Sequence, residues 1–307
     1  MSFLKLIRFQ NLIMLAIMQL IFHYGFLKMQ ALPLALNDWQ YLILVLSTVC
    51  IAAGGYLINN IFDRATDEIN KPGDVVVDKG IPEAMAYNIY MVLNIIGVGA
   101  GFYLSNLIGK PGFALLFIVI SGTLYLYASG LKQTLLIGNI IIALLLSISI
   151  ITVGIFDLLP MITPQNQAGM GLLFEILLDY AVFAFIINFI REIVKDLEDV
   201  KGDYNQGMNT LPIALGVDRT VRIVFGLSFI PIGLIIYYIN EHLFSNDLYY
   251  ATAYGLALIL APLLYFTIKI FSAKKQKEFN HLSTVLKIVI FFGILSIAVI
   301  NYNIKYA

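Results

Sequence analysis

Residues 40–72 read QYLILVLSTVCIAAGGYLINNIFDRATDEINKP. Up to Phe62 the stretch contains only apolar, small and uncharged polar side chains. A helix needs about 20 predominantly apolar residues to cross a hydrocarbon core about 30 Å thick. Beyond Phe62 the composition changes, and carboxylates, amides and bases follow one another as far as Pro72. The stretch therefore predicts a membrane-spanning helix that ends in a charged segment.

The rest of the chain has the same apolar character. Of its 307 residues, 60% are hydrophobic and 12% are charged, whereas soluble domains are about 45–50% apolar. Nine apolar stretches have the necessary length, at 10–29, 40–62, 83–106, 112–130, 135–158, 171–194, 220–240, 248–271 and 282–303. We therefore expect an all-α, polytopic membrane helical bundle of about nine transmembrane helices, built as a single domain over residues 1–307.

The basic residues predict how the bundle is oriented. When the loops are numbered alternately, all but three of the 19 Lys and Arg fall on the side of the N-terminus; the exceptions are Lys28, Lys110 and Lys305. Loops rich in Lys and Arg stay in the cytoplasm. We expect an integral membrane protein, in the inner membrane if the cell is bacterial, with the N-terminus and long polar loops cytoplasmic and the C-terminus outside.

Two other features narrow the class of protein. The formal net charge is zero, so nothing indicates a nucleic-acid partner. Lys5 and Arg8 precede the first apolar stretch as in a signal peptide, but no small-residue cleavage site follows. We therefore expect the first stretch to be a retained span.

Acidic residues gather at the ends of the second and sixth apolar stretches. The two groups are Asn59, Asp63 and Asp67, and Asp196, Asp199 and Asp203. At about 100° per residue, each group lies on one face of a helix, provided that the helix continues through the whole group. Gly202 is expected to end regular helix before Asp203. The spacing therefore predicts two rows of oxygen atoms at the cytoplasmic rim of the bundle.

These rows suit a divalent cation. Mg²⁺ prefers carboxylates, retained waters and substrate phosphates to a cage made only of protein. The neighbouring bases Arg64, Lys71, Arg191 and Lys195 would complement a polyanion once metal ions neutralise the carboxylates. Ordinary solvated loop charges explain any single aspartate, but they explain two matched rows poorly. A membrane transporter is the main non-enzyme alternative, although it would place ionisable residues nearer the middle of the membrane.

The motifs resemble those of the UbiA superfamily of intramembrane prenyltransferases. Residues Asn59 to Asp67 resemble its N-D-x-x-D-x-x-x-D signature, and the second group resembles its second Asp-rich motif. Asn70-Lys71-Pro72 matches its N-K-P segment, and Tyr127 to Lys132 with Gly138-Asn139 resembles its Y-S-x-x-L-K…G-N segment. The resemblance covers essentially the whole chain.

The resemblance implies Mg²⁺-dependent transfer of a prenyl group from an isoprenoid diphosphate to a lipophilic acceptor. It also implies that the protein is in contact with membrane lipid. It implies catalytic roles for Asp63, Asp67, Asp196 and Asp199. Mg²⁺ would be held by Asn59, Asp63, Asp67, Asp196, Asp199 and Asp203. Diphosphate would contact Asn59, Lys71, Lys132, Arg191 and Lys195, and substrate would contact Asn139 and Tyr127. The form of the second motif favours the branch that prenylates geranylgeranylglyceryl phosphate, with the aromatic-acid and naphthoate prenyltransferases of quinone biosynthesis as the alternative.

The chain departs from the family pattern at two places. Asn60 stands where the family usually has Asp, which removes one carboxylate from the first group. The usual Arg-Pro after Asn70-Lys71-Pro72 is missing, and the chain continues with Gly73 and Asp74. We expect Lys79 to take the place of the missing arginine.

Overall fold

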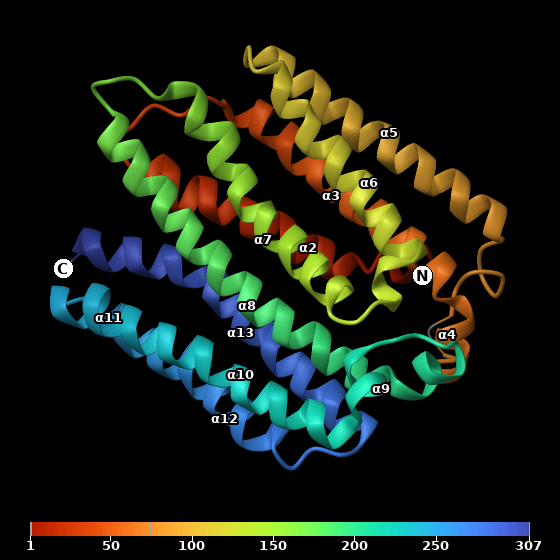
Figure 1. Cartoon of the computed structure of the whole chain (residues 1–307). Helices are drawn as coiled ribbons and strands as arrows, with labels where there is room; N and C mark the ends of the chain where they lie inside the picture. Colours follow the sequence, from red (N-terminus) through yellow and green to blue (C-terminus); the bar gives the residue numbers. More distant parts are fainter. Residues whose placement is uncertain (1, 74, 307) are drawn as a thin grey trace.

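The computed structural model describes residues 2–73 and 75–306, so Asp74 lies outside the described residues. This part of the chain forms a bundle of long helices (Figure 1). Nine of the helices found in it are long and apolar enough to cross a membrane, at Phe9–Met29, Asp38–Phe62, Glu83–Leu107, Pro111–Ser129, Ile137–Met161, Gln167–Asn205, Val217–Asn246, Tyr249–Ile270 and Gln276–Tyr306. Each overlaps one of the predicted stretches, so the prediction of an all-α membrane bundle is confirmed.

Turns and loops join the helices. Their bounds are α1 (Ser2–Leu6), α2 (Phe9–Leu20), α3 (Asp38–Phe62), α4 (Arg64–Asn70), α5 (Glu83–Leu107), α6 (Ala114–Ser129), α7 (Ile137–Asp157), α8 (Gln167–Asn205), α9 (Leu211–Leu215), α10 (Val217–Tyr238), α11 (Tyr249–Tyr254), α12 (Ala261–Ile270) and α13 (Gln276–Tyr306). A π-helical turn at Ile21–Phe26 continues α2. The sequence pattern predicted a helix here but not its π-helical form. Local chemistry explains where α3 begins: the Asn37 side chain accepts from the Gln40 N–H at 3.0 Å and Gln40 Oε1 accepts from the Asn37 N–H at 2.9 Å, which is a capping box.

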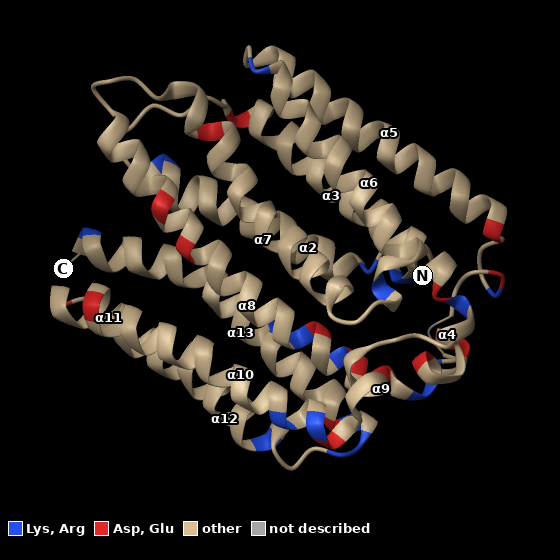
Figure 2. Ribbon diagram, viewed as in Figure 1, with Lys and Arg blue, Asp and Glu red and all other residues tan. Residues whose placement is uncertain are grey.

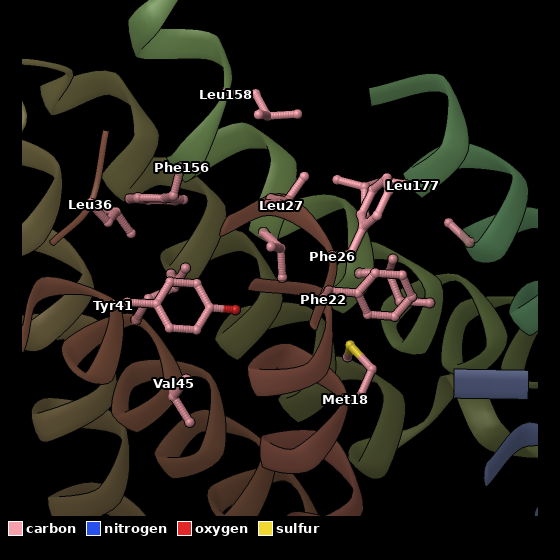
Figure 3. Packing of buried hydrophobic residues seen from close by; sticks show 14 of the residues in the cluster. Met18, Phe22, Phe26, Leu27, Leu36, Tyr41, Val45, Phe156, Leu158 and Leu177 are labelled. Atoms are coloured by element: carbon pink, nitrogen blue, oxygen red, sulfur yellow. The ribbon is translucent and has the colours of Figure 1, made fainter. Parts of the chain in front are cut away.

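The two largest clusters of buried apolar residues hold most of the bundle together. The first joins α2, α3, α6 and α7 to the first half of α8, and Figure 3 shows Phe22, Tyr41 and Phe156 packed within it. The second joins the other half of α8 to α10, α12 and α13. The long helix α8 therefore contributes to both cores. Apolar side chains such as Ile95 and Ile268 remain exposed on the outer faces, as expected for surfaces that contact lipid.

The charged residues concentrate at one end of the bundle, around α4 and α9 (Figure 2). The N-terminal helices approach this end, whereas the C-terminus lies at the opposite end (Figure 1). An odd number of crossings produces this arrangement. Because α3, α4, α8 and α13 all reach the charged end, their polar residues meet there although these helices are spread along the sequence.

Candidate active site

The first acidic group lies where α3 meets α4. α3 ends at Phe62 and α4 begins at Arg64, so Asp63 occupies a turn between two helices. Helical hydrogen bonding nevertheless continues: the Asp63 N–H donates to Asn59 O and the Asp67 N–H donates to Asp63 O, both at 2.8 Å. The spacing of four therefore keeps the side chains of Asn59, Asp63 and Asp67 on the wall of one cavity.

The second group lies on a single helix. Gly202 was expected to end it, and that prediction is wrong, because α8 continues to Asn205 and includes Asp203. The reason is a contact with α4 that local propensity does not reveal. The side chain of Asn70 accepts from the Gly202 N–H at 2.8 Å and donates to Asp199 O at 2.9 Å. Asn70 therefore fastens the first motif to the backbone of the second.

The close approach of α4 to α8 requires glycine at position 202. A Cβ atom there would lie 2.4 Å from Asn70 Nδ2 and 2.8 Å from Thr66 O. We expect Gly202→Ala to lower the free energy of unfolding by about 1–3 kcal/mol, the usual cost of overpacking. Thermal unfolding in detergent measures the change. Gly226→Ala in α10 is the control, because no atom lies within 4 Å of its Cβ position; an equal loss in both variants would contradict the contact.

Both acidic groups line one polar cavity, which has an empty volume of about 1540 Å³, part of it open to solvent. Every residue predicted to bind metal or diphosphate lies on its wall, as does Tyr127, whereas Asn139, predicted to contact substrate, does not. The residues predicted to bind metal or diphosphate are Asn59, Asp63, Asp67, Lys71, Lys132, Arg191, Lys195, Asp196, Asp199 and Asp203. Asn139 acts from behind the wall, since its side-chain amide donates to Asp196 Oδ2 at 2.8 Å.

The predicted lysines interleave with the carboxylates. Lys71 Nζ lies 2.9 Å from Asp199 Oδ1 and 3.0 Å from Glu198 Oε1. Lys132, in the turn after α6, pairs with Asp63, which joins residues 69 positions apart. These pairs fix both lysines at the cavity. Burial tends to lower the pKa of Lys71, but the charges and hydrogen bonds of Asp199 and Glu198 together outweigh burial, so this pKa is raised. Both lysines therefore present cationic donors to an anion in the cavity.

The remaining predicted bases behave differently. Lys195 Nζ donates to Glu192 Oε1 at 2.6 Å, and Arg191 Nη1 lies 3.6 Å from the same oxygen. Arg64 turns away from the site and pairs with Asp78 in the following loop. Lys79 is exposed and does not line the cavity, so it does not replace the missing arginine there.

Asn60 has a role that a carboxylate could not fill. Its side-chain amide donates to the carbonyl oxygens of Leu6 and Tyr56, each at 2.8 Å. A carboxylate lacks the N–H groups for both bonds. The departure from the family pattern therefore coincides with a hydrogen bond that ties α1 to α3.

The chemistry of the first group fits a hard divalent cation. Asn59 Oδ1 is buried and accepts no hydrogen bond. Burial and, next, the charge of Asp63 raise the pKa of Asp67 to about 6. A cation that binds oxygen would give Asn59 Oδ1 a partner and would lower the pKa of Asp67. Within residues 2–73 and 75–306, no group of three or more His, Cys, Asp or Glu side chains is arranged so that it could hold a metal ion.

An apolar cavity begins at the inner wall of the polar one. The two share a mouth formed by Arg8, Asn59, Tyr127, Arg191, Glu192 and Lys195. From there the first apolar cavity follows α3 back to Thr48 and ends near Phe117 and Thr152. The distance from Asn59 to Thr48 corresponds to about three helical turns. Tyr127, predicted to contact substrate, stands at the boundary between the polar and apolar spaces.

Sequence reasoning missed several residues of the site. Arg8, Asn11 and Lys287 line its cavities, yet none of the three was predicted as a site residue. Their position at the span ends predicted to be cytoplasmic was a usable signal, because those ends converge on the aspartates. No motif spacing connects them, since Asn11 and Lys287 are 276 positions apart and meet only in the fold.

A polar cavity lined by carboxylates and basic side chains that opens into an apolar cavity inside a membrane bundle suits a membrane-embedded prenyltransferase. Comparison with known proteins agrees: the model of the UbiA prenyltransferase family matches residues 20–298, and the chain belongs to that family. It is 32% identical over 207 residues to digeranylgeranylglyceryl phosphate synthase of Sulfurisphaera tokodaii, which covers 64% of this chain and 69% of that one. The synthase of Korarchaeum cryptofilum is 28% identical over 261 residues, 84% of each chain.

Solved structures share the fold. One described as digeranylgeranylglyceryl phosphate synthase in membranes has a TM-score of 0.65 at 22% identity, and the match covers 98% of this chain and 97% of that one. A UbiA homologue from Archaeoglobus fulgidus bound to DMAPP and Mg²⁺ has a TM-score of 0.62 at 16% identity, with 97% and 99% covered. The predicted membrane prenyltransferase fold is therefore confirmed.

Proposed function

We propose that this enzyme transfers a geranylgeranyl group from its diphosphate to geranylgeranylglyceryl phosphate in a Mg²⁺-dependent reaction. The observation that carries the proposal is the direct junction between the polar cavity lined by both acidic groups and the first apolar cavity. An isoprenoid diphosphate has the same two-part character. The positive-inside bias supports a site that faces the cytoplasm.

The residues of the site divide the work. Asn59, Asp63 and Asp67 on one side, and Asp196, Asp199 and Asp203 on the other, would hold Mg²⁺ against the diphosphate. Bound Mg²⁺ supplies positive charge that stabilises the departing diphosphate. Lys71 and Lys132 would donate hydrogen bonds to oxygens of the departing diphosphate. Asn139 keeps Asp196 oriented through its 2.8 Å hydrogen bond.

The transfer exchanges one carbon–oxygen bond for another. The bond from C1 of the donor to diphosphate breaks, and diphosphate leaves with the electron pair. The acceptor hydroxyl oxygen bonds to C1, and its proton passes to the departing diphosphate. The apolar cavity excludes water from the allylic cation that develops at C1. Tyr127 lies at the mouth where C1 would be placed.

An assay of purified protein in lipid tests the proposal. It combines labelled geranylgeranyl diphosphate and Mg²⁺ with one of three acceptors: geranylgeranylglyceryl phosphate, 4-hydroxybenzoate or 1,4-dihydroxy-2-naphthoate. We expect transfer to the glyceryl phosphate, abolished by EDTA and restored by Mg²⁺. Transfer to either aromatic acceptor instead would assign the enzyme to quinone biosynthesis. Failure of folded protein to release diphosphate from the donor would refute the proposed chemistry.

A further inference from the structure

One wall of the polar cavity carries more positive than negative charge. It holds Arg8, Arg191, Lys195 and Lys287, and Glu192 is the carboxylate among them. Glu192 pairs with Lys195 at 2.6 Å and with Arg191 at 3.6 Å. In the described part of the chain, neither Arg8 nor Lys287 forms an ion pair. This wall therefore differs from the acidic wall, where Lys71 and Lys132 are paired with aspartates.

Neutral groups contact three of these cations, Arg8, Arg191 and Lys287. Lys287 Nζ donates to Asn11 Oδ1 at 2.6 Å, and Arg191 Nε donates to Ser283 O at 3.3 Å. The Arg8 guanidinium lies 5.5 Å from the centre of the Tyr56 ring. The backbone of Arg8 is left-handed, with φ 49°, a conformation that is costly for a residue other than glycine. Arg8 and Lys287 are thus positioned without an ion pair in the described part of the chain, and Arg191 shares a single carboxylate, that of Glu192, with Lys195.

A second apolar cavity begins at this wall. Its lining includes Asn11, Arg191 and Lys287 at the polar end, and its empty volume is about 900 Å³. Farther in, it reaches Tyr180, Phe183 and Gly293, which also line a third cavity between α8, α10 and α13. The lining of the third cavity includes Val182 and Leu234, side chains exposed at the outer surface of the bundle. An apolar chain could therefore reach the basic wall from the bilayer.

We propose that Arg8, Arg191 and Lys287 bind the phosphate of the lipid acceptor, whose chain occupies the second apolar cavity; this inference rests on the proposed function. A phosphate monoester carries a charge of about −1.5 to −2 at pH 7 and three acceptor oxygens. Two guanidinium groups and an ammonium group match both its charge and its oxygens. The donor diphosphate has its own proposed partners among the acidic residues and lysines, so the two anions would bind to different groups of residues that line one cavity.

The test compares two acceptors that differ only in the phosphate, geranylgeranylglyceryl phosphate and geranylgeranylglycerol. We expect wild-type protein to favour the phosphorylated acceptor in kcat/KM. Lys287→Gln and Arg8→Gln should each shrink that preference by at least tenfold, because a hydrogen bond to a charged group contributes about 1.5–3 kcal/mol. The KM for geranylgeranyl diphosphate should change little. Lys277→Gln, exposed on the same helix as Lys287, is the control and should keep the preference.

Each other outcome is decisive. A rise in the KM for the donor as large as the loss of preference would show that these cations bind diphosphate, and would overturn the inference. Equal wild-type transfer to both acceptors, or variants that keep the preference, would overturn it while leaving the proposed function intact. Transfer to neither glyceryl acceptor would refute the proposed function itself. Thermal unfolding of each variant identifies any that fails to fold.

Discussion

Asp67→Asn is expected to lower kcat/KM for prenyl transfer about a thousandfold, the scale of losing one preorganised electrostatic contact to a transition state. Asp67 lines the polar cavity and makes no ion pair within residues 2–73 and 75–306. Its replacement therefore removes a proposed metal ligand without leaving a base unpaired. Asp63→Asn would be harder to interpret, because Asp63 pairs with Lys132.

The matched control is Glu68→Gln, one residue farther along α4. Glu68 is exposed, lies 3.7 Å from Arg64 and does not line the cavity. We expect it to retain activity, as exposed ion pairs contribute little. Initial rates at saturating and limiting Mg²⁺ distinguish weakened metal binding from a defect in chemistry. If Glu68→Gln and Asp67→Asn lose activity alike, the first acidic row does not hold the metal.

Stability measurements separate this effect from misfolding. Burial and the charge of Asp63 raise the pKa of Asp67 to about 6, above its ordinary value of 3.8. A carboxyl whose pKa rises on folding destabilises the fold above that pKa, and the penalty disappears as the pH falls toward 4. In EDTA at pH 7, Asp67→Asn should therefore unfold at a temperature equal to or above that of wild type. A markedly lower temperature would mean that the loss of activity is structural.

Leu145→Trp is expected to lower activity with a C20 donor much more than activity with a C10 donor. Leu145 lines the first apolar cavity, so a larger ring there would obstruct the path of the prenyl chain. Each CH₂ of the prenyl chain that is displaced from the apolar cavity into water costs about 0.8 kcal/mol. Displacing two or three of them therefore lowers kcat/KM for a C20 donor about 30-fold. A C10 donor, which need not reach as far, should lose much less.

The neighbouring Leu144 provides the control, because its side chain is 47% exposed on the outer face of α7. Leu144→Trp adds the same bulk to the lipid-facing surface and should leave the ratio of kcat/KM for geranylgeranyl and geranyl diphosphate unchanged. If Leu145→Trp lowers both donors equally, the first cavity does not hold the prenyl chain. If it lowers neither, the chain lies elsewhere, with the second cavity as the next candidate.

The spans and the acidic rows were predictable from local pattern. A bilayer imposes a threshold of length and hydropathy on each crossing, and every one of the nine stretches satisfies it without reference to a partner. The spacing of Asn59, Asp63 and Asp67 is likewise local, because helical hydrogen bonding continues across the turn at Asp63. A resemblance in two motifs was then enough to indicate the family.

The details of the site depended on neighbours far away in the chain. Gly202 has the local signature of a helix end, but contact with Asn70, 132 positions away, makes it part of α8. The bond of Asn60 to Leu6 and that of Lys287 to Asn11 likewise join distant segments. Helices in a membrane are apolar on almost every face, so hydropathy does not indicate which of them meet. Local sequence pattern was thus enough to predict the membrane spans, the two acidic groups and the family. The basic wall and the apolar cavities depend on which helices pack together, which only the tertiary structure shows.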